Sequence, residues 1–208
     1  IITYILSATM QPRISIITIC YNAASTITRT LRSVSAQTYP NIQYLIIDGA
    51  SKDNTLELVR ELAPEAEIYS ERDKGIYDAM NKGLDRATGD YVWYVNAGDA
   101  LASPTTVEDL VRATCTGDSL PDVLYGDTRL IDAEDHDLGL RRLRPPHQLD
   151  WRSFRSGMLV CHQAFVAKRS ISPHYDLRYR FSADVDWCIR VLKEAKTTAF
   201  YPDPIALY

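Results

Sequence analysis

Three aspartates stand at positions where a strand end or a helix start would place a carboxylate for chemistry. Asp48 directly follows the apolar run 42–47, and Asp99 follows the apolar run 91–95 after a short turn. Asp184 lies in the first turn of a predicted helix. A carboxylate can accept hydrogen bonds from a ribose or base, bind a divalent cation, or take a proton from a hydroxyl. The three positions therefore predict a site for a nucleotide and a metal, with a general base at its mouth.

Each aspartate also has a structural explanation, which the sequence leaves open. Asp48 could shape the turn after it and cap the next helix, and Asp99 could form an Asx turn or cap a helix near Ala100. The helix dipole would stabilise both Asp184 and Asp186 in the first turn of their helix. Because these two acids are two positions apart, they cannot point in the same direction. One of the two could therefore be a general base at the mouth of the site.

A second group of polar residues surrounds a predicted helix start at Gly75. Arg72 and Lys74 lie where backbone N–H groups and the helix dipole favour anions. We assign Asp73 and Lys74 to ligand binding, although a solvated charged face would give the same pattern. His162, one of four histidines, fits a structural role better than a catalytic one.

A parallel sheet would bring these side chains together. Near-continuous apolar runs predict buried strands at 14–20, 42–47 and 91–95. Shorter runs predict further strands at 67–70, 123–125 and 197–201. Helical spacing of apolar residues predicts helices over 25–36, with Ser25 as cap, over 75–86 and over 182–196. A further helix is expected directly after the turn 49–54. The alternation indicates an α/β sandwich, whose ligand sits outside the carboxyl ends of the strands. Residues 127–157 indicate hairpins or a flexible loop.

Composition and charge exclude several classes of protein. With 208 residues, 46% of them hydrophobic, the chain can bury the core of one domain. A net charge of -4 argues against a nucleic-acid binder. Four scattered cysteines without a Cys-x-x-Cys pair argue against a zinc cage or disulfide framework and favour a reducing compartment. No glycine-rich phosphate loop and no membrane-spanning apolar run is present.

Four motifs in sequence order resemble those of family 2 glycosyltransferases with the GT-A fold. They lie at 16–22, 45–55, 73–83 and 89–99, and a weaker match follows at 183–187. The resemblance covers most of residues 12–201. It implies a Rossmann-like three-layer α/β sandwich with a mostly parallel central sheet over residues 12–208. We expect an N-terminal extension at 1–11 and a truncation at the C-terminus.

This resemblance implies an inverting transfer of a sugar from a nucleoside-diphosphate sugar, by family tendency a UDP-sugar, to an acceptor hydroxyl. Asp99 would bind Mg²⁺ or Mn²⁺, and Asp184 would be the catalytic base. The residues implied in donor binding are Tyr21, Asn22, Asp48, Asp73, Lys74 and Asn96.

Motifs 72–83 and 96–99 resemble a bacterial branch tied to capsule, colanic acid and lipopolysaccharide synthesis. The acceptor would then be a saccharide or a lipid-linked saccharide. That would place the enzyme in the cytoplasm, in peripheral contact with the inner face of the membrane.

The chain departs from the family pattern in three places. The family often has acids at the positions of Asn96 and Gly98, an arginine at Met80, and an acceptor-side segment beyond residue 208. Lys74 would compensate for the missing arginine. The lost acids keep open a non-catalytic protein that binds sugar nucleotides. A second alternative, a sugar nucleotidyltransferase, should carry a basic glycine-rich loop after the first strand, and residues 21–25 do not form one.

Overall fold

The computed structural model describes residues 10–116 and 119–208. The predicted extension 1–11 lies outside the described residues except for its last two positions. The strands are β1 (Ile14–Cys20), β2 (Ile42–Asp48), β3 (Glu67–Ser70), β4 (Tyr91–Tyr94), β5 (Ala100–Leu101), β6 (Val123–Ile131), β7 (Asp137–Leu140), β8 (Phe165–Lys168) and β9 (Thr198–Leu207). They form one sheet in the order β3-β2-β1-β4-β8-β6-β9-β5, and β7 pairs with β6.

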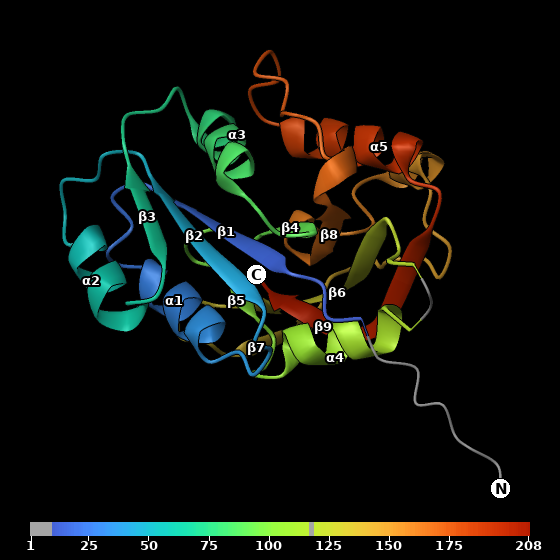
Figure 1. Ribbon diagram of the computed structural model, residues 1–208, viewed down its shortest axis with the longest axis horizontal. Helices are drawn as coiled ribbons and strands as arrows, with labels where there is room; N and C mark the ends of the chain where they lie inside the picture. The colour runs from blue at the N-terminus through green and yellow to red at the C-terminus, as the bar shows by residue number, and fades with distance from the viewer. Residues whose placement is uncertain (1–9, 117–118) are drawn as a thin grey trace, which may run out of the picture.

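Helices cover both faces of this sheet. They are α1 (Ile27–Ser35), α2 (Thr55–Leu62), α3 (Ile76–Arg86), α4 (Thr106–Thr114) and α5 (Ala183–Glu194), with short 3₁₀ helices at Trp151–Ser156, His162–Ala164 and Arg169–Ile171. In Figure 1, α1, α2 and α4 lie on one side of the sheet, and α3 and α5 lie on the other. This arrangement confirms the predicted three-layer α/β sandwich.

The strands of the first half are parallel and buried. β1 pairs in parallel with β2 and β4, and β2 pairs with β3. All of β1 is buried, as its near-continuous apolar sequence predicts. The register sets Cys20 opposite Asp48 and Asp48 opposite Ser70. The ends of three strands therefore present their last side chains at one edge of the sheet.

The second half departs from strict alternation. β8 runs antiparallel to β4 and β6, and β5 runs antiparallel to β9. Residues 127–157 contain the end of β6, its hairpin with β7, and the 3₁₀ helix Trp151–Ser156. The predicted cap is wrong at one helix, because Thr26, not Ser25, occupies the cap position of α1.

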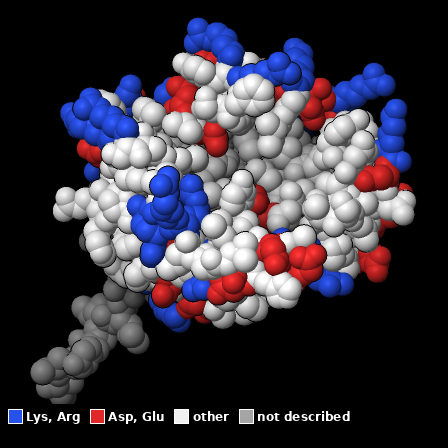
Figure 2. All heavy atoms as spheres, turned by 180° about the vertical axis from the view of Figure 1, so that it is seen from behind, with Lys and Arg blue, Asp and Glu red and all other residues white. Residues whose placement is uncertain are grey.

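Further properties bear on the predicted class. Within 10–116 and 119–208, no helix is long and apolar enough to cross a membrane. All four cysteines are free and buried. One face of the molecule is hollowed near its centre, and basic and acidic side chains are interspersed around that hollow (Figure 2).

Helix α3 approaches the sheet closely at Gly83. A Cβ atom added there would lie 2.6 Å from Ile17 Cγ2 and 3.2 Å from Ile47 Cγ1. The absence of a side chain thus lets α3 rest directly on β1 and β2. This contact sets the distance between α3 and the sheet, and with it the position of the start of α3 relative to the carboxyl ends of the strands.

We expect Gly83→Val to lower the free energy of unfolding by about 1–3 kcal/mol, because the core has no space for the added methyl groups. Urea unfolding followed by circular dichroism measures the loss. The control is Glu57→Val at an exposed position of α2, which should change the value by about 0.5 kcal/mol or less. Equal losses in both variants would contradict the packing explanation.

Candidate active site

The carboxylate of Asp48 organises the loops at the carboxyl edge of the sheet. It is completely buried. It accepts hydrogen bonds from Ser51 N at 3.0 Å, Ser70 Oγ at 2.6 Å, and the Ser51 hydroxyl. The Cys20 thiol lies 3.7 Å from it and donates to the same oxygen as the Ser51 hydroxyl. Since both oxygens have partners within the chain, Asp48 acts by holding the loop 49–54 in place.

That loop brings together residues far apart in the sequence. Asn22 adopts a left-handed conformation with φ 46°. Its Oδ1 accepts from Lys52 N at 2.9 Å, and its own N–H donates to Ser51 Oγ at 2.8 Å. A Cβ on Gly49 would lie 2.7 Å from Asp73 Oδ2 and 3.2 Å from Tyr21. A glycine at position 49 therefore allows the Asp73 carboxylate and the Tyr21 ring to pack against the start of the loop.

These residues line a cavity of about 460 Å³. Predicted site residues in its wall are Tyr21, Asn22, Asp73 and Asn96. The Tyr21 side chain is 60% exposed and offers a flat ring to a ligand. Asp48 lies beneath this wall, and Lys74 is exposed outside it. The structure thus brings four of the six predicted donor-binding residues to one cavity.

The turn 96–99 lies at the edge of this cavity, with Asn96 and Ala97 in the cavity wall and the buried Asp99 behind it. Thr30 of α1 is fully buried, and its hydroxyl donates to Asp99 O at 2.6 Å and accepts from Gly98 N at 3.0 Å. Gly98 has φ 105°, a conformation that favours glycine. The Asp99 carboxylate accepts from Gln163 Nε2 at 2.9 Å. The side chain of Thr30 therefore fixes the backbone that carries Asp99.

Burial raises the pKa of Asp99 to about 6, although the hydrogen bond from Gln163 and the charge of Arg29 oppose the rise. The neighbouring Asn96 Oδ1 is buried and has no hydrogen-bond partner. A carboxylate and an amide oxygen are the donors that Mg²⁺ and Mn²⁺ prefer. The residues present therefore fit a hard divalent cation.

A smaller cavity of about 180 Å³ continues from the first, since Ile76 and Asn96 line both. Asp184 lies in its wall and accepts a hydrogen bond from the Tyr77 hydroxyl at 3.2 Å. Asp186 instead forms an ion pair with Arg190 at 2.7 Å. The two acids of the helix start thus have different partners, as their spacing requires.

His162 lines this same cavity. Its Nε2 lies 2.8 Å from the Tyr175 hydroxyl, and its ring packs against Tyr94 and Trp187. Burial lowers the pKa of His162 to about 4, and the nearby Asp184 only partly opposes this. The imidazole is therefore neutral at pH 7, as one wall of the cavity beside Asp184.

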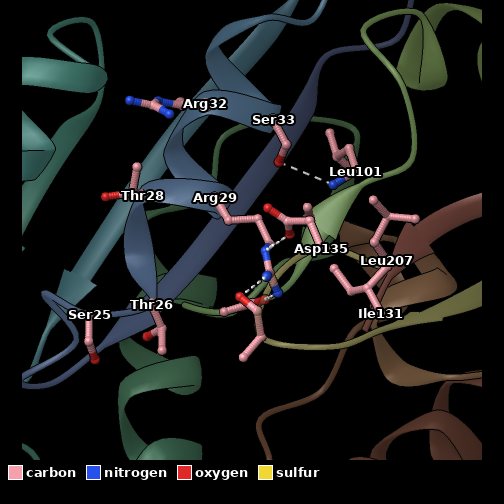
Figure 3. A pocket seen from close by; sticks show the side chains of 13 residues that line it. Ser25, Thr26, Thr28, Arg29, Arg32, Ser33, Leu101, Ile131, Asp135 and Leu207 are labelled. Carbon is pink, nitrogen blue, oxygen red and sulfur yellow. Dashed lines mark hydrogen bonds and ion pairs between the residues drawn. The ribbon is translucent and has the colours of Figure 1, made fainter. Parts of the chain in front are cut away.

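A larger cavity, of about 670 Å³, shares Ser25 and Thr26 with the cavity lined by Tyr21 but contains none of the predicted site residues (Figure 3). Arg29 crosses it from α1 and donates to Asp132 O at 3.0 Å and Ala133 O at 3.2 Å. It also pairs with Asp135 at 2.5 Å. Arg29 thereby attaches the turn between β6 and β7 to α1.

That turn also carries a cluster of possible metal ligands, Asp132, Glu134 and His136. Asp132 Oδ1 accepts from the backbone N–H groups of Glu134 and His136, and Oδ2 lies 2.9 Å from His136 Nδ1. Hydrogen bonding within the turn thus accounts for the cluster without an ion.

A family profile and two sequence relatives identify the family of this chain. The sequence profile described as "Glycosyl transferase family 2" matches residues 15–174. The chain belongs to glycosyltransferase family 2. This glycosyltransferase is 34% identical over 188 residues to a PGL/p-HBAD biosynthesis glycosyltransferase of Mycobacterium bovis, covering 86% of the chain and 69% of that relative. It is 33% identical over 189 residues to an uncharacterised glycosyltransferase of Mycobacterium tuberculosis, covering 88% of the chain and 70% of the relative.

Solved structures confirm the GT-A fold of this glycosyltransferase. Staphylococcus aureus TarS 1–349 in complex with UDP-GlcNAc superposes with a TM-score of 0.77 at 16% identity, covering 94% of the chain and 58% of that fragment. A Pyrobaculum calidifontis mannosyltransferase in complex with GDP-Man and Mn²⁺ gives 0.69 at 18% identity, with 96% and 57% covered. The chain therefore spans less than two thirds of these two structures.

Sequence reasoning missed several residues of the site in this glycosyltransferase. Thr30 and Tyr77 lie within predicted helices, where nothing in the pattern separates them from packing residues. Gln163 follows His162, and its contact with Asp99 depends on the pairing of β4 with β8. Arg141 lies in the irregular region after β7, where no periodicity guides a prediction.

We expect Asp99→Asn to remove a pH-dependent cost of folding. The pKa of Asp99 rises from 3.8 to about 6 on folding, so the folded wild type binds more protons than the unfolded chain between those values. Without metal, the stability of the wild type should fall as pH rises from about 4 to 6, by up to about 3 kcal/mol relative to Asp99→Asn. The full difference should persist above pH 6. Urea unfolding across this range in chelator measures it.

The matched control is Glu57→Gln, which removes a carboxylate from an exposed position of α2. Its stability should follow the wild-type curve at every pH. If Asp99→Asn also runs parallel to the wild type from pH 4 to 7, burial does not raise the pKa of Asp99.

Proposed function

We propose that this protein transfers a sugar from a nucleoside-diphosphate sugar, with a UDP-sugar as donor, to an acceptor hydroxyl with inversion at the anomeric carbon. The observation that carries this proposal is the pair of cavities that meet at Asn96 and Ile76. One cavity offers an aromatic ring and polar groups, and the other contains a carboxylate. A nucleotide and its sugar fit such an arrangement end to end.

We call the cavity of about 460 Å³ the nucleoside cavity. There, Tyr21, Asn22 and Asp73 would contact the base and ribose. Asp48 would contribute by holding the loop 49–54, because its oxygens already have partners. Lys74 would reach the donor from outside the cavity wall. The TarS structures in complex with UDP and UDP-GlcNAc support a uridine nucleotide as the donor class.

Asp99 and Asn96 would hold Mg²⁺ or Mn²⁺ beside the donor diphosphate. The ion, when bound, supplies positive charge that stabilises the leaving diphosphate. The unpartnered Asn96 Oδ1 supports this assignment. The mannosyltransferase structure in complex with Mn²⁺ supports it by fold similarity.

Asp184 would act as the general base. The acceptor oxygen attacks the anomeric carbon, and its proton passes to the Asp184 carboxylate. The bond between the anomeric carbon and the diphosphate oxygen breaks, and its electron pair leaves with the nucleoside diphosphate. Attack from the face opposite the leaving group inverts the centre. Tyr77 would orient Asp184 through its hydrogen bond at 3.2 Å.

For the acceptor we propose a saccharide or lipid-linked saccharide in the synthesis of bacterial surface polysaccharides. One relative is named as a glycosyltransferase of PGL/p-HBAD biosynthesis, which supports a biosynthetic role for the transfer. Such an acceptor would place the enzyme in the cytoplasm, at the inner face of the membrane. Residues 12–208 would form the catalytic domain.

We expect UDP to bind at least about tenfold more tightly with Mn²⁺ than with chelator, because the ion links the diphosphate to the protein. Isothermal titration calorimetry measures the affinity. Asp99→Ala should abolish the gain from Mn²⁺. Glu134→Ala, in the exposed cluster between β6 and β7, should retain it. Metal-independent UDP binding that is unchanged in Asp99→Ala would exclude Asp99 as the ligand.

We expect Asp184→Asn to bind UDP like the wild type but to transfer sugar about 10²–10⁴ times more slowly, because the acceptor hydroxyl then lacks its proton acceptor. Release of UDP from UDP-sugars with a panel of saccharide acceptors measures the rate. The control Asp186→Asn removes an acid that pairs with Arg190 and should retain most activity.

Equal turnover in wild type and Asp184→Asn would exclude Asp184 as the base. UDP binding by a wild type that transfers no sugar would instead favour the non-catalytic alternative.

A further inference from the structure

We propose that Arg141 binds the diphosphate of the donor and stabilises its charge as the glycosidic bond to the nucleotide breaks. This inference rests on the proposed function. It assigns the phosphate-binding cation to a part of the chain outside the four motifs.

The charges in the two cavities point to Arg141. In the nucleoside cavity the charged side chain is Asp73, and in the cavity of Asp184 the charged side chains are Asp184 and Arg141. Among residues 10–116 and 119–208, Arg141 is the one lysine or arginine that lines either cavity. A nucleoside diphosphate placed across both would meet one side-chain cation.

The position of the diphosphate follows from the shared wall. With the nucleoside near Tyr21 and the sugar near Asp184, the diphosphate must cross where the cavities meet, at Asn96 and Ile76. Arg141 lines the cavity that begins at this crossing. Its guanidinium can form two parallel hydrogen bonds to phosphate oxygens.

Arg141 and the exposed Arg142 have no acidic partner within 10–116 and 119–208, whereas an arginine on either side of them has one. Arg129 pairs with Asp137, and Arg144 pairs with the buried Asp127. These two ion pairs anchor the segment on either side of Arg141. The described residues give Arg141 itself only a backbone hydrogen bond, from its N–H to Thr128 O at 3.2 Å.

Arg141 is also partly buried. Its charge opposes the rise in the pKa of the Cys161 thiol that burial causes, so the guanidinium lies near the cavity wall at Cys161. A partly buried cation without a counter-ion is costly. A bound phosphate would remove that cost.

The motifs themselves place no lysine or arginine in the wall of either cavity. Met80 stands where an arginine is often found in the family, and its side chain is 2% exposed. Lys74 is exposed and lines neither cavity. Arg141, in the segment after β7, therefore supplies the cation that α3 lacks at Met80.

The test is a titration of UDP and of uridine into the wild type, Arg141→Gln, Arg141→Lys and Arg142→Gln, all with saturating Mn²⁺. Arg142 is exposed and lines neither cavity, so it is the matched control. We expect Arg141→Gln to weaken UDP binding about ten- to hundredfold, because one charged hydrogen-bond partner is lost. Uridine binding should not change, Arg141→Lys should be intermediate, and Arg142→Gln should resemble the wild type.

Equal UDP affinity in wild type and Arg141→Gln would overturn the inference while the proposed function stands. An equal loss for UDP and uridine would also overturn it, because the cavity as a whole would then be disturbed. If UDP affinity is unchanged and the acceptor KM rises, Arg141 binds an anionic acceptor instead. A wild type that binds neither UDP nor GDP would refute the proposed function and, with it, this inference.

Discussion

The site depends on one buried carboxylate at the edge of the sheet. The parallel register places Cys20, Asp48 and Ser70 side by side, and Asp48 accepts hydrogen bonds from the loop after β2 and from the last residue of β3. A buried carboxylate requires such partners, because an unsatisfied charge in the interior is costly. Asp48 thus holds Ser51 of the loop 49–54, and Ser51 Oγ in turn accepts from Asn22 N, while Gly49 at the start of the loop leaves room for Asp73.

A second constraint acts on the other side of β1. Thr30 holds the backbone of the turn 96–99, and Gln163 holds the Asp99 side chain. These contacts come from α1 and from the 3₁₀ helix before β8, two elements on either side of the turn. Asp99 is thus held in a buried position and forms no ion pair with a described residue. This burial raises the pKa of Asp99.

The sequence predicts the parallel half, the start of β6 and helix α5 well and the segments between β6 and α5 poorly, for a physical reason. Buried parallel strands consist of continuous apolar runs, so β1, β2 and β4 and the residues at their ends follow directly from the pattern. The wall that contains Arg141 and Gln163 depends on the antiparallel pairing of β8 and on the β6–β7 hairpin. Such long-range pairing leaves no local signal, and the contact of Tyr77 with Asp184 is of the same kind.

The smaller cavity has two sides of different origin. One side is the start of α3, which Gly83 seats on the sheet and which also borders the nucleoside cavity. The other side comes from Arg141, Met158 and Tyr208, outside the parallel half. Under the proposed function, substitutions at Met158 or Tyr208 would change which sugar or acceptor fits while the nucleotide contacts of Tyr21, Asp73 and Arg141 are retained. In that case the substrate range could diverge while the half proposed to bind the nucleotide stays constant.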